Sequence, residues 1–457
     1  MPSSLLGDLA AQIDSLSSAH SVGRVIGIEA GTIQVGGSIS QVRLGDRCRI
    51  LRKNGIAVFG EVVQLKQDKL SVLPEGSING IAIQDRAIIL PPATIAPSDA
   101  WMGRVIDAAG NPLDGKPLLR GTTTRGLHNA PPLAAKRRAL GQRLNTGMAI
   151  TNTLLPIVTG QRMGLFAGSG VGKSSLLGHF AKHMQADVVV IALIGERGRE
   201  LRHFLDEIVG KEGLSRTIVV AATSDQSPLQ RRQCAWTAMA AAEHFRDLGH
   251  SVLLMADSIT RFAEAHREVA VASGEAPVLR GYPPSTAPEI MALCERAGPG
   301  QNGQGDITAI FTVLVAGSDM DEPIADILRG VLDGHIVLDR EIAERGRYPA
   351  IDVLRSVSRS LPVAANQHEN TLLEQVRYLL GLFERNAMMI RAGLYAQGSD
   401  PEVDLAIAIW PDLDAFFARP ETLDSTHSFQ QLELLLRRGG GLPGILAQST
   451  AASARLV

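Results

Sequence analysis

A glycine-rich turn between an apolar strand and an apolar helix constrains the fold of this chain more than any other feature. Residues 163–178 read MGLFAGSGVGKSSLLG and contain the pattern Ala167-x-x-x-x-Gly172-Lys173-Ser174. Glycines let the turn point its backbone N–H groups at phosphate oxygens, and the following helix adds the positive end of its dipole. Lys173 can reach the β- and γ-phosphates, and the Ser174 hydroxyl can ligate Mg²⁺. The first position is alanine, which only the looser form of the pattern allows.

The whole loop is expected to surround the phosphates of a nucleotide. The residues predicted to do so are Ala167, Gly168, Ser169, Gly170, Val171, Gly172, Lys173, Ser174 and Ser175.

Several strongly apolar segments alternate with helical patterns around this loop. Strands that are apolar on both faces belong in a parallel sheet covered by helices, so the central part of the chain is predicted to be an α/β domain. The predicted strands are Arg162–Ala167, Val188–Ile194, Thr217–Ala222, Val252–Asp257 and Thr308–Val315.

Two carboxylates follow predicted strands of this sheet. Because ligands bind at the carboxyl ends of parallel strands, Asp257, at the end of SVLLMAD, could hold Mg²⁺ through its water shell. The alternative is that Asp257 caps a helix over Ser258–Val269. Glu196 lies just past Val188–Ile194 and could polarise a water molecule for attack on a γ-phosphate. Its alternative is a charged surface turn.

The segment from Gly23 to about Pro92 has a different pattern of apolar and polar residues. Short alternating stretches broken by glycine, asparagine and aspartate are typical of a small antiparallel barrel or sandwich. These stretches are Arg24–Glu29, Thr32–Val35, Val58–Leu65 and Ile81–Leu90. After about Pro362 the strand pattern gives way to helical spacing, over 369–395 and near 429–437.

The two ends of the chain carry no strand pattern. Residues 1–20 have apolar side chains at helical spacing, which predicts an amphipathic helix that either packs on its own domain or docks to a partner protein. The tail beyond Arg438 is rich in Gly, Ala and Ser and is expected to be mobile. The expected organisation is an N-terminal partner-binding segment 1–22, a β-barrel domain 23–92, a nucleotide-binding domain 93–365, a helical domain 366–440 and a mobile tail 441–457.

Composition excludes several classes of protein. With 45 basic and 47 acidic residues the formal charge is −2, which argues against a surface built for nucleic acid. Three distant cysteines without a CxxC pattern support neither a disulfide framework nor a cysteine zinc site. Apolar runs stay below the ~18 residues of a membrane-spanning helix, and the N-terminus lacks the pattern of a secretion signal. We therefore expect a cytoplasmic protein.

Taken together, four segments resemble a known family. GLFAGSGVGKS, GERGRE, LLMADSITRFAEAHREVA and YPAIDVLRSVSR are similar to the catalytic subunits of the F-type, V-type and type III secretion ATPases. The resemblance covers nearly the whole chain, including WMGRVIDAAGNPLDG ahead of the phosphate loop. Within the family, the combination resembles the flagellum-specific ATPase of the bacterial export apparatus. A virulence-type secretion ATPase is very similar, and a rotary ATP synthase subunit is a more distant alternative. The resemblance implies a RecA-like central domain with an N-terminal β-barrel and a C-terminal helical domain.

The resemblance also assigns roles to individual residues. It implies that Glu196 activates the attacking water, that Arg197 contacts the γ-phosphate and that Tyr348 stacks on adenine. Arg359 matches the arginine finger that enters the site of a neighbouring subunit, where a guanidinium would stabilise the transferring phosphoryl group. Without the resemblance, Tyr348 could be a core tyrosine and Arg359 a surface ion-pair arginine. One chain carrying both Glu196 and Arg359 can complete a site with copies of itself, which predicts a homohexamer.

Ligands and partners follow from the same resemblance. They are ATP with Mg²⁺, a stator-like regulatory protein at the N-terminus, a central stalk protein, export chaperone–substrate complexes and a membrane export gate that the ATPase meets peripherally at the inner membrane. Nucleic acid is not expected. A subunit that binds nucleotide without turnover is the alternative from another class, and Glu196 argues against it.

Overall fold

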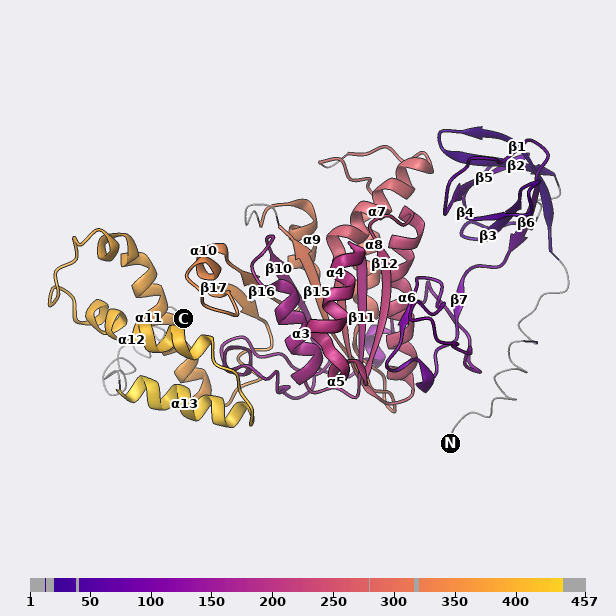
Figure 1. The fold of residues 1–457 in the computed structure, drawn as a ribbon. Helices are drawn as coiled ribbons and strands as arrows, with labels where there is room; N and C mark the ends of the chain where they lie inside the picture. Colours follow the sequence, from indigo (N-terminus) through magenta and orange to yellow (C-terminus); the bar gives the residue numbers. More distant parts are fainter. Residues whose placement is uncertain (1–12, 14–19, 38–40, 279, 316–319, 439–457) are drawn as a thin grey trace.

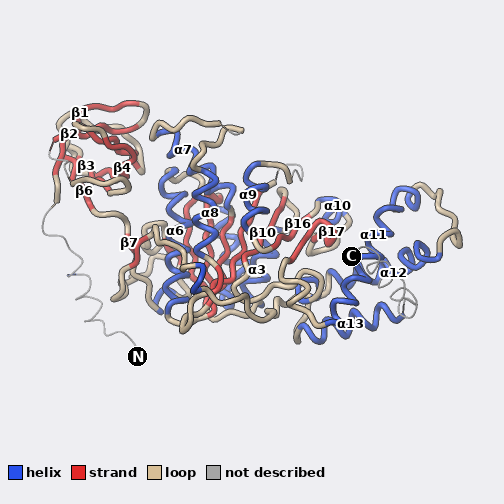
Figure 2. Tube along the Cα trace, turned by 180° about the vertical axis from the view of Figure 1, so that it is seen from behind, coloured by secondary structure: helices blue, strands red, loops and turns tan. Residues whose placement is uncertain are grey.

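A computed structural model describes residues 13, 20–37, 41–278, 280–315 and 320–438. The described chain forms a β-barrel at one end, a large sheet flanked by helices in the middle and a helical region at the other end (Figure 1). Figure 2 shows the same arrangement from behind, with the barrel and the helical region on opposite sides of the central sheet. The predicted N-terminal helix lies almost entirely outside the described residues, as does the predicted tail 441–457.

The N-terminal part is a closed antiparallel barrel rather than a sandwich. Its strands follow the order β1-β2-β5-β4-β3-β6, and its core is a separate cluster that includes Ile33, Val35 and Val72. The predicted stretch Ile81–Leu90 is a strand only from Arg86 onward, because its first residues form a turn. The barrel strands are β1 (Val22–Glu29), β2 (Thr32–Gly37), β3 (Arg47–Leu51), β4 (Ala57–Leu65), β5 (Lys69–Pro74) and β6 (Arg86–Leu90).

The central sheet has the order β17-β16-β10-β15-β13-β11-β12-β8. Every strand predicted for this region is present, with ends that differ from the prediction by at most two residues. These strands are β10 (Arg162–Ala167), β11 (Val188–Glu196), β12 (Thr217–Thr223), β13 (Ser251–Asp257) and β15 (Asp306–Leu314), and they run parallel to one another. The sheet also contains β8 (Val105–Ile106), β16 (Gly334–Leu338) and β17 (Ile351–Ser358), the last antiparallel to β16.

Helices cover both faces of this sheet, which is why its strands are apolar throughout. Along β11, Val189 and Ile191 pack into one core and Val190 and Ala192 into the other. The larger flanking helices are α3 (Lys173–His183), α6 (Pro228–Asp247), α7 (Ile259–Ala272), α8 (Thr286–Arg296) and α9 (Pro323–Val331). Shorter elements are β7 (Thr94–Ile95), β9 (Arg125–Gly126), α2 (Ala149–Asn152), α4 (Gly198–His203), a π-helical turn (Phe204–Val209), α5 (Gly210–Leu214), β14 (Gly298–Pro299), α10 (Arg340–Glu344) and the 3₁₀ turns Asp99–Trp101 and Ala134–Lys136.

The C-terminal region consists of α11 (Gln367–Arg391), α12 (Pro401–Phe417) and α13 (Ser425–Arg438). A capping box between Asn366 and Glu369 begins α11, and the Asp400 side chain caps α12. Phe383 of α11 and Trp410 of α12 stack with ring centroids 4.2 Å apart. Apolar residues of these helices belong to the same core as α3, so the region packs on the side of the sheet that carries the phosphate loop. Within the described residues, no helix is both long and apolar enough to cross a membrane.

Candidate active site

The glycine-rich turn joins the end of β10 to the start of α3, as the sequence predicts. Gly170 and Gly172 have φ angles of +78° and +91°, a conformation that side chains with a Cβ rarely adopt. Gly172 is also held close to another residue, because a methyl group there would lie 3.2 Å from the Cδ1 and Cε1 atoms of Tyr348. The backbone conformation therefore favours glycine at this position, and a larger residue would also have to displace the Tyr348 ring.

This turn lines a large cavity with a volume of about 1300 Å³. That volume exceeds the ~300–1000 Å³ typical of small-molecule sites, so a nucleotide leaves room for further groups. All the predicted loop residues line the cavity except Val171, whose side chain is buried beneath the turn. Glu196 and Arg197 line it from the end of β11.

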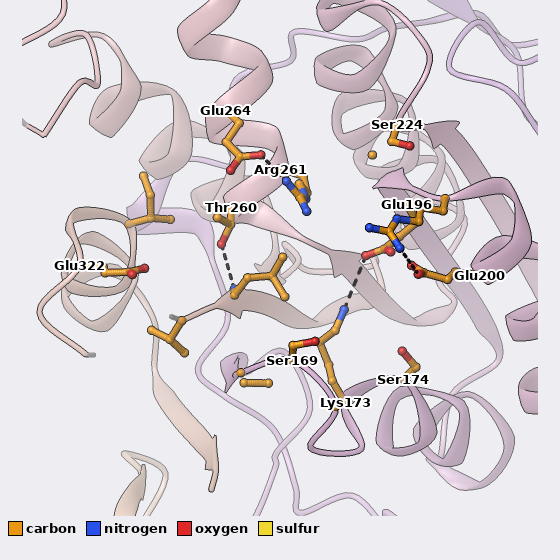
Figure 3. Close-up of a pocket in the computed structure, with 18 of the residues that line it drawn as sticks. Ser169, Lys173, Ser174, Glu196, Glu200, Ser224, Thr260, Arg261, Glu264 and Glu322 are labelled. Atoms are coloured by element: carbon orange, nitrogen blue, oxygen red, sulfur yellow. Dashed lines mark hydrogen bonds and ion pairs between the residues drawn. The ribbon is translucent and has the colours of Figure 1, made fainter. Parts of the chain in front are cut away.

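Lys173 lies between two carboxylates that come from different strands. Its Nζ atom forms a hydrogen-bonded ion pair with Oδ1 of Asp257. The same Nζ atom lies 3.8 Å from Oε1 of Glu196 (Figure 3). Asp257 is only 2% exposed. The alternative that Asp257 caps the next helix is wrong, because Ser258 caps α7 by accepting a hydrogen bond from the Arg261 amide.

The electrostatic setting of Glu196 suits a group that exchanges protons near neutral pH. Burial of the carboxyl group and the nearby negative charge of Asp257 raise the pKa of Glu196 from 4.5 to about 7, against the opposing effect of Lys173. A general base is most effective when its pKa lies near the working pH.

A pH dependence follows from this pKa. Because a base acts only when it is unprotonated, kcat/KM for ATP should rise with pH through a midpoint near 7 instead of near 4.5. The quantity kcat/KM reports ionisations of the free enzyme, so a phosphate-release assay across about pH 5–8 measures it. A flat profile over this interval would show that Glu196 is not the base.

Arg197 is predicted to meet the γ-phosphate. Its side chain is 72% exposed and pairs with Glu200 at 3.8 Å, so it lies at the open edge of the cavity. Beyond Glu196, Arg197 and Glu200, several charged side chains line the same cavity and were not predicted as site residues from the sequence. They are Arg231, Arg261, Glu264, Arg267, Arg280 and Glu322. Arg261 could have been predicted to lie near the site, since it stands in the first turn of the helix that follows Asp257.

Tyr348 and Arg359 lie apart from the carboxylates. Tyr348 is 51% exposed, which makes the alternative of a core tyrosine wrong. Its ring lies beside the phosphate loop, 3.2 Å from where a Cβ atom at Gly172 would stand. Arg359 directly follows β17, is exposed and donates a hydrogen bond to the carbonyl oxygen of Arg329 at 3.1 Å. It does not line the cavity of its own chain.

The oxygen atoms around Lys173 fit a magnesium ion that brings most of its own ligands. The Ser174 hydroxyl and the Asp257 carboxylate are the hard oxygen donors that Mg²⁺ prefers. Among the described residues, no group of three or more His, Cys, Asp or Glu side chains could hold a metal ion. A Mg²⁺ ion at a nucleotide phosphate takes its other ligands from water and phosphate oxygens.

Comparisons with known proteins place the chain in a family. Residues 147–358 match the nucleotide-binding domain of the ATP synthase alpha/beta family, and residues 365–433 match the "T3SS EscN ATPase C-terminal domain". The chain is 42% identical over 438 residues to the "Flagellum-specific ATP synthase" of Caulobacter vibrioides, covering 94% of this chain and 99% of that protein. It is 44% identical over 408 residues to the protein of the same name from Salmonella typhimurium, covering 86% and 90%.

Solved structures agree with these matches. The assembled ATPase EscN of the enteropathogenic E. coli type III secretion system superposes with a TM-score of 0.83 at 35% identity, covering 91% of this chain and all of EscN. EscN in complex with its central stalk EscO gives a TM-score of 0.82 at 36% identity, with the same coverage. This protein is therefore an ATP hydrolase of the ATP synthase alpha/beta family, in the group that contains the flagellum-specific and type III secretion ATPases.

Proposed function

We propose that this protein is the ATPase of a bacterial flagellar export apparatus, which hydrolyses ATP to ADP and phosphate to drive the unfolding, chaperone release or delivery of exported proteins. The observation that carries the proposal is the group of Lys173, Glu196 and Asp257 at the phosphate loop of a chain that matches flagellum-specific relatives at 40–44% identity over most of its length. A virulence secretion ATPase is the second candidate, and the 35% identity to EscN supports it less strongly.

The proposed chemistry is in-line attack of water on the γ-phosphate of ATP. The turn from Gly168 to Gly172 binds the phosphates through its backbone N–H groups, and Lys173 leaves the carboxylates to neutralise them. Glu196 orients the water and accepts its proton. Tyr348 stacks on adenine, and Arg197 binds the γ-phosphate. Mg²⁺, when bound by the Ser174 hydroxyl and through water by Asp257, supplies positive charge on the phosphate oxygens.

The active form is proposed to be a homohexamer. Arg359 is exposed and lies outside the cavity of its own chain, so its guanidinium could exchange the hydrogen bond to the Arg329 carbonyl oxygen for a neighbour's site. The cavity is larger than a nucleotide needs, which leaves room for that guanidinium. In a rotary ATP synthase the catalytic glutamate and the finger come mainly from different kinds of chain. Glu196 and Arg359 on one chain therefore argue against that alternative.

The remaining partners are assigned to separate parts of the chain. The helical domain 366–440 is proposed to meet export chaperone–substrate complexes and the central stalk protein. The segment 1–22 is proposed to bind a stator-like protein. The other two proposed domains are the barrel 23–92 and the nucleotide-binding domain 93–365. The assembly is proposed to act peripherally at the membrane export gate, on the cytoplasmic side of the inner membrane.

Dilution of the purified protein tests the proposal. Because each site needs a guanidinium from a neighbouring protomer, phosphate release from Mg²⁺-ATP per protomer should fall as dilution dissociates the ring. Light scattering at each concentration reports the oligomeric state. Full specific activity in a dilute monomer would refute the shared site, and absence of ATP hydrolysis at any concentration would refute the function.

A further inference from the structure

Asp257 has a second partner that belongs neither to the phosphate loop nor to the motifs of the sequence. The Thr312 hydroxyl on β15 donates a hydrogen bond to Oδ1 of Asp257 at 2.7 Å. The two residues lie on neighbouring parallel strands, and the register pairs Ala256 with Phe311 directly before them. Thr312 is fully buried and Asp257 is 2% exposed, so the bond is shielded from water.

The Thr312 proton has two acceptors within reach, and the carboxylate is the better one. The hydroxyl lies 3.2 Å from the carbonyl oxygen of Ala256 and 2.7 Å from the Asp257 carboxylate. A hydroxyl carries one proton, and hydrogen bonds to charged oxygens are the shorter and stronger kind. The bond to Asp257 is therefore the principal one.

Thr312 and Lys173 both contact Oδ1 of Asp257, but only one of them can move. Lys173 stands on the first turn of α3 at the cavity and is expected to turn toward phosphate when nucleotide binds. Thr312 lies within the sheet on β15, and β15 is also tied to the start of α7, because the Leu314 amide donates to the Thr260 hydroxyl at 2.9 Å. Once Lys173 has turned away, Thr312 is the hydrogen-bond donor that stays on the carboxylate.

We propose that Thr312 is a positioning residue, whose hydroxyl holds the Asp257 carboxylate in the orientation needed to bind the hydrated Mg²⁺ of a nucleotide. The proposal rests on the proposed function, since it takes Asp257 as the carboxylate that faces the metal. Side chains that orient a metal-binding carboxylate typically change metal affinity by about 10–100-fold when they are lost.

Three substitutions separate the hydroxyl from the shape of the side chain. Thr312→Val keeps the shape and loses the hydroxyl, Thr312→Ser keeps the hydroxyl, and Thr312→Ala loses both hydroxyl and methyl group. Serine and alanine both lack the methyl group, so their comparison isolates the hydroxyl even if the valine variant folds poorly. Thr308→Val is the matched control, because Thr308 is buried on the same strand and its hydroxyl accepts from the Gly160 amide, four residues or about 13 Å from Thr312.

Binding of ADP to the full chain, measured by calorimetry with EDTA and then over a Mg²⁺ titration, is the test. For Thr312→Val and Thr312→Ala we expect about 10-fold or greater loss in apparent Mg²⁺ affinity, with ADP affinity in EDTA unchanged. Thr312→Ser and Thr308→Val should match the wild type.

Three results would contradict the proposals, two of them the role of the hydroxyl and the third the proposed function. Wild-type Mg²⁺ dependence in both the valine and alanine variants, or equal losses in the serine and alanine variants, would overturn the role of the hydroxyl while leaving the proposed function intact. A wild-type protein that binds no ADP with or without Mg²⁺ would overturn the proposed function itself.

Discussion

Replacing Glu196 by glutamine is expected to lower kcat for ATP hydrolysis by about 10³-fold while nucleotide affinity stays within a few fold of wild type. The amide has almost the same shape as the carboxylate but cannot accept a proton from the attacking water. The phosphate loop and Lys173, which line the cavity and are proposed to bind the phosphates, remain unchanged. An effect on kcat without an effect on binding indicates an interaction made only in the transition state.

Single-turnover phosphate release and equilibrium binding of ADP measure the two quantities separately. Glu207→Gln provides the matched control, because Glu207 is exposed on the π-helical turn and does not line the cavity. It should hydrolyse ATP as the wild type does. Turnover retained in Glu196→Gln would remove this residue from the catalytic role, and a loss of binding equal to the loss of turnover would make it a binding residue instead.

Replacing Arg359 by alanine should also lower kcat by at least about 10³-fold, the scale found for arginine fingers. This loss is expected although Arg359 lies outside the cavity of its own chain, because its guanidinium is proposed to act in the next protomer. Arg340→Ala, which removes another exposed arginine that does not line the cavity, should retain activity.

Mixing the two inactive variants distinguishes action between chains from action within one chain. In a ring assembled from equal amounts of Glu196→Gln and Arg359→Ala protomers, roughly a quarter of the interfaces join an intact glutamate to an intact arginine. Unfolding and refolding the mixture together should therefore recover up to about a quarter of wild-type turnover. A mixture as inactive as its components, formed into rings of normal size, would contradict a site shared between neighbours.

The strands around the phosphate loop could be predicted because each is a continuous apolar run that is buried on both faces. The strands β16 and β17 were missed. β17 alternates between buried and exposed residues at the edge of the sheet, and β16 is only five residues long. Helix α12 was missed as well, and its sequence contains Pro411 in the interior, which normally argues against a helix.

Some residues of the candidate site could likewise be predicted from local sequence patterns, and others could not. Glu196 and Asp257 could be found because each ends an apolar strand, and strand ends mark the ligand edge of a parallel sheet. Arg267 and Arg280 could not be assigned to the site, because their nearness to the phosphate loop depends on how α7 and the segment after it fold back over the sheet. No local pattern in the sequence encodes that distance.

The sequence by itself determined the phosphate loop and its chemistry, since the turn is made by contiguous residues whose left-handed backbone demands glycine at positions 170 and 172. Only the tertiary structure decided which side chains meet there. Lys173 reaches a carboxylate 84 residues away, and the Thr312 hydroxyl reaches the same oxygen from 55 residues away. Such contacts depend on which strands become neighbours in the sheet, a choice made by the packing of the whole domain and not by any one segment.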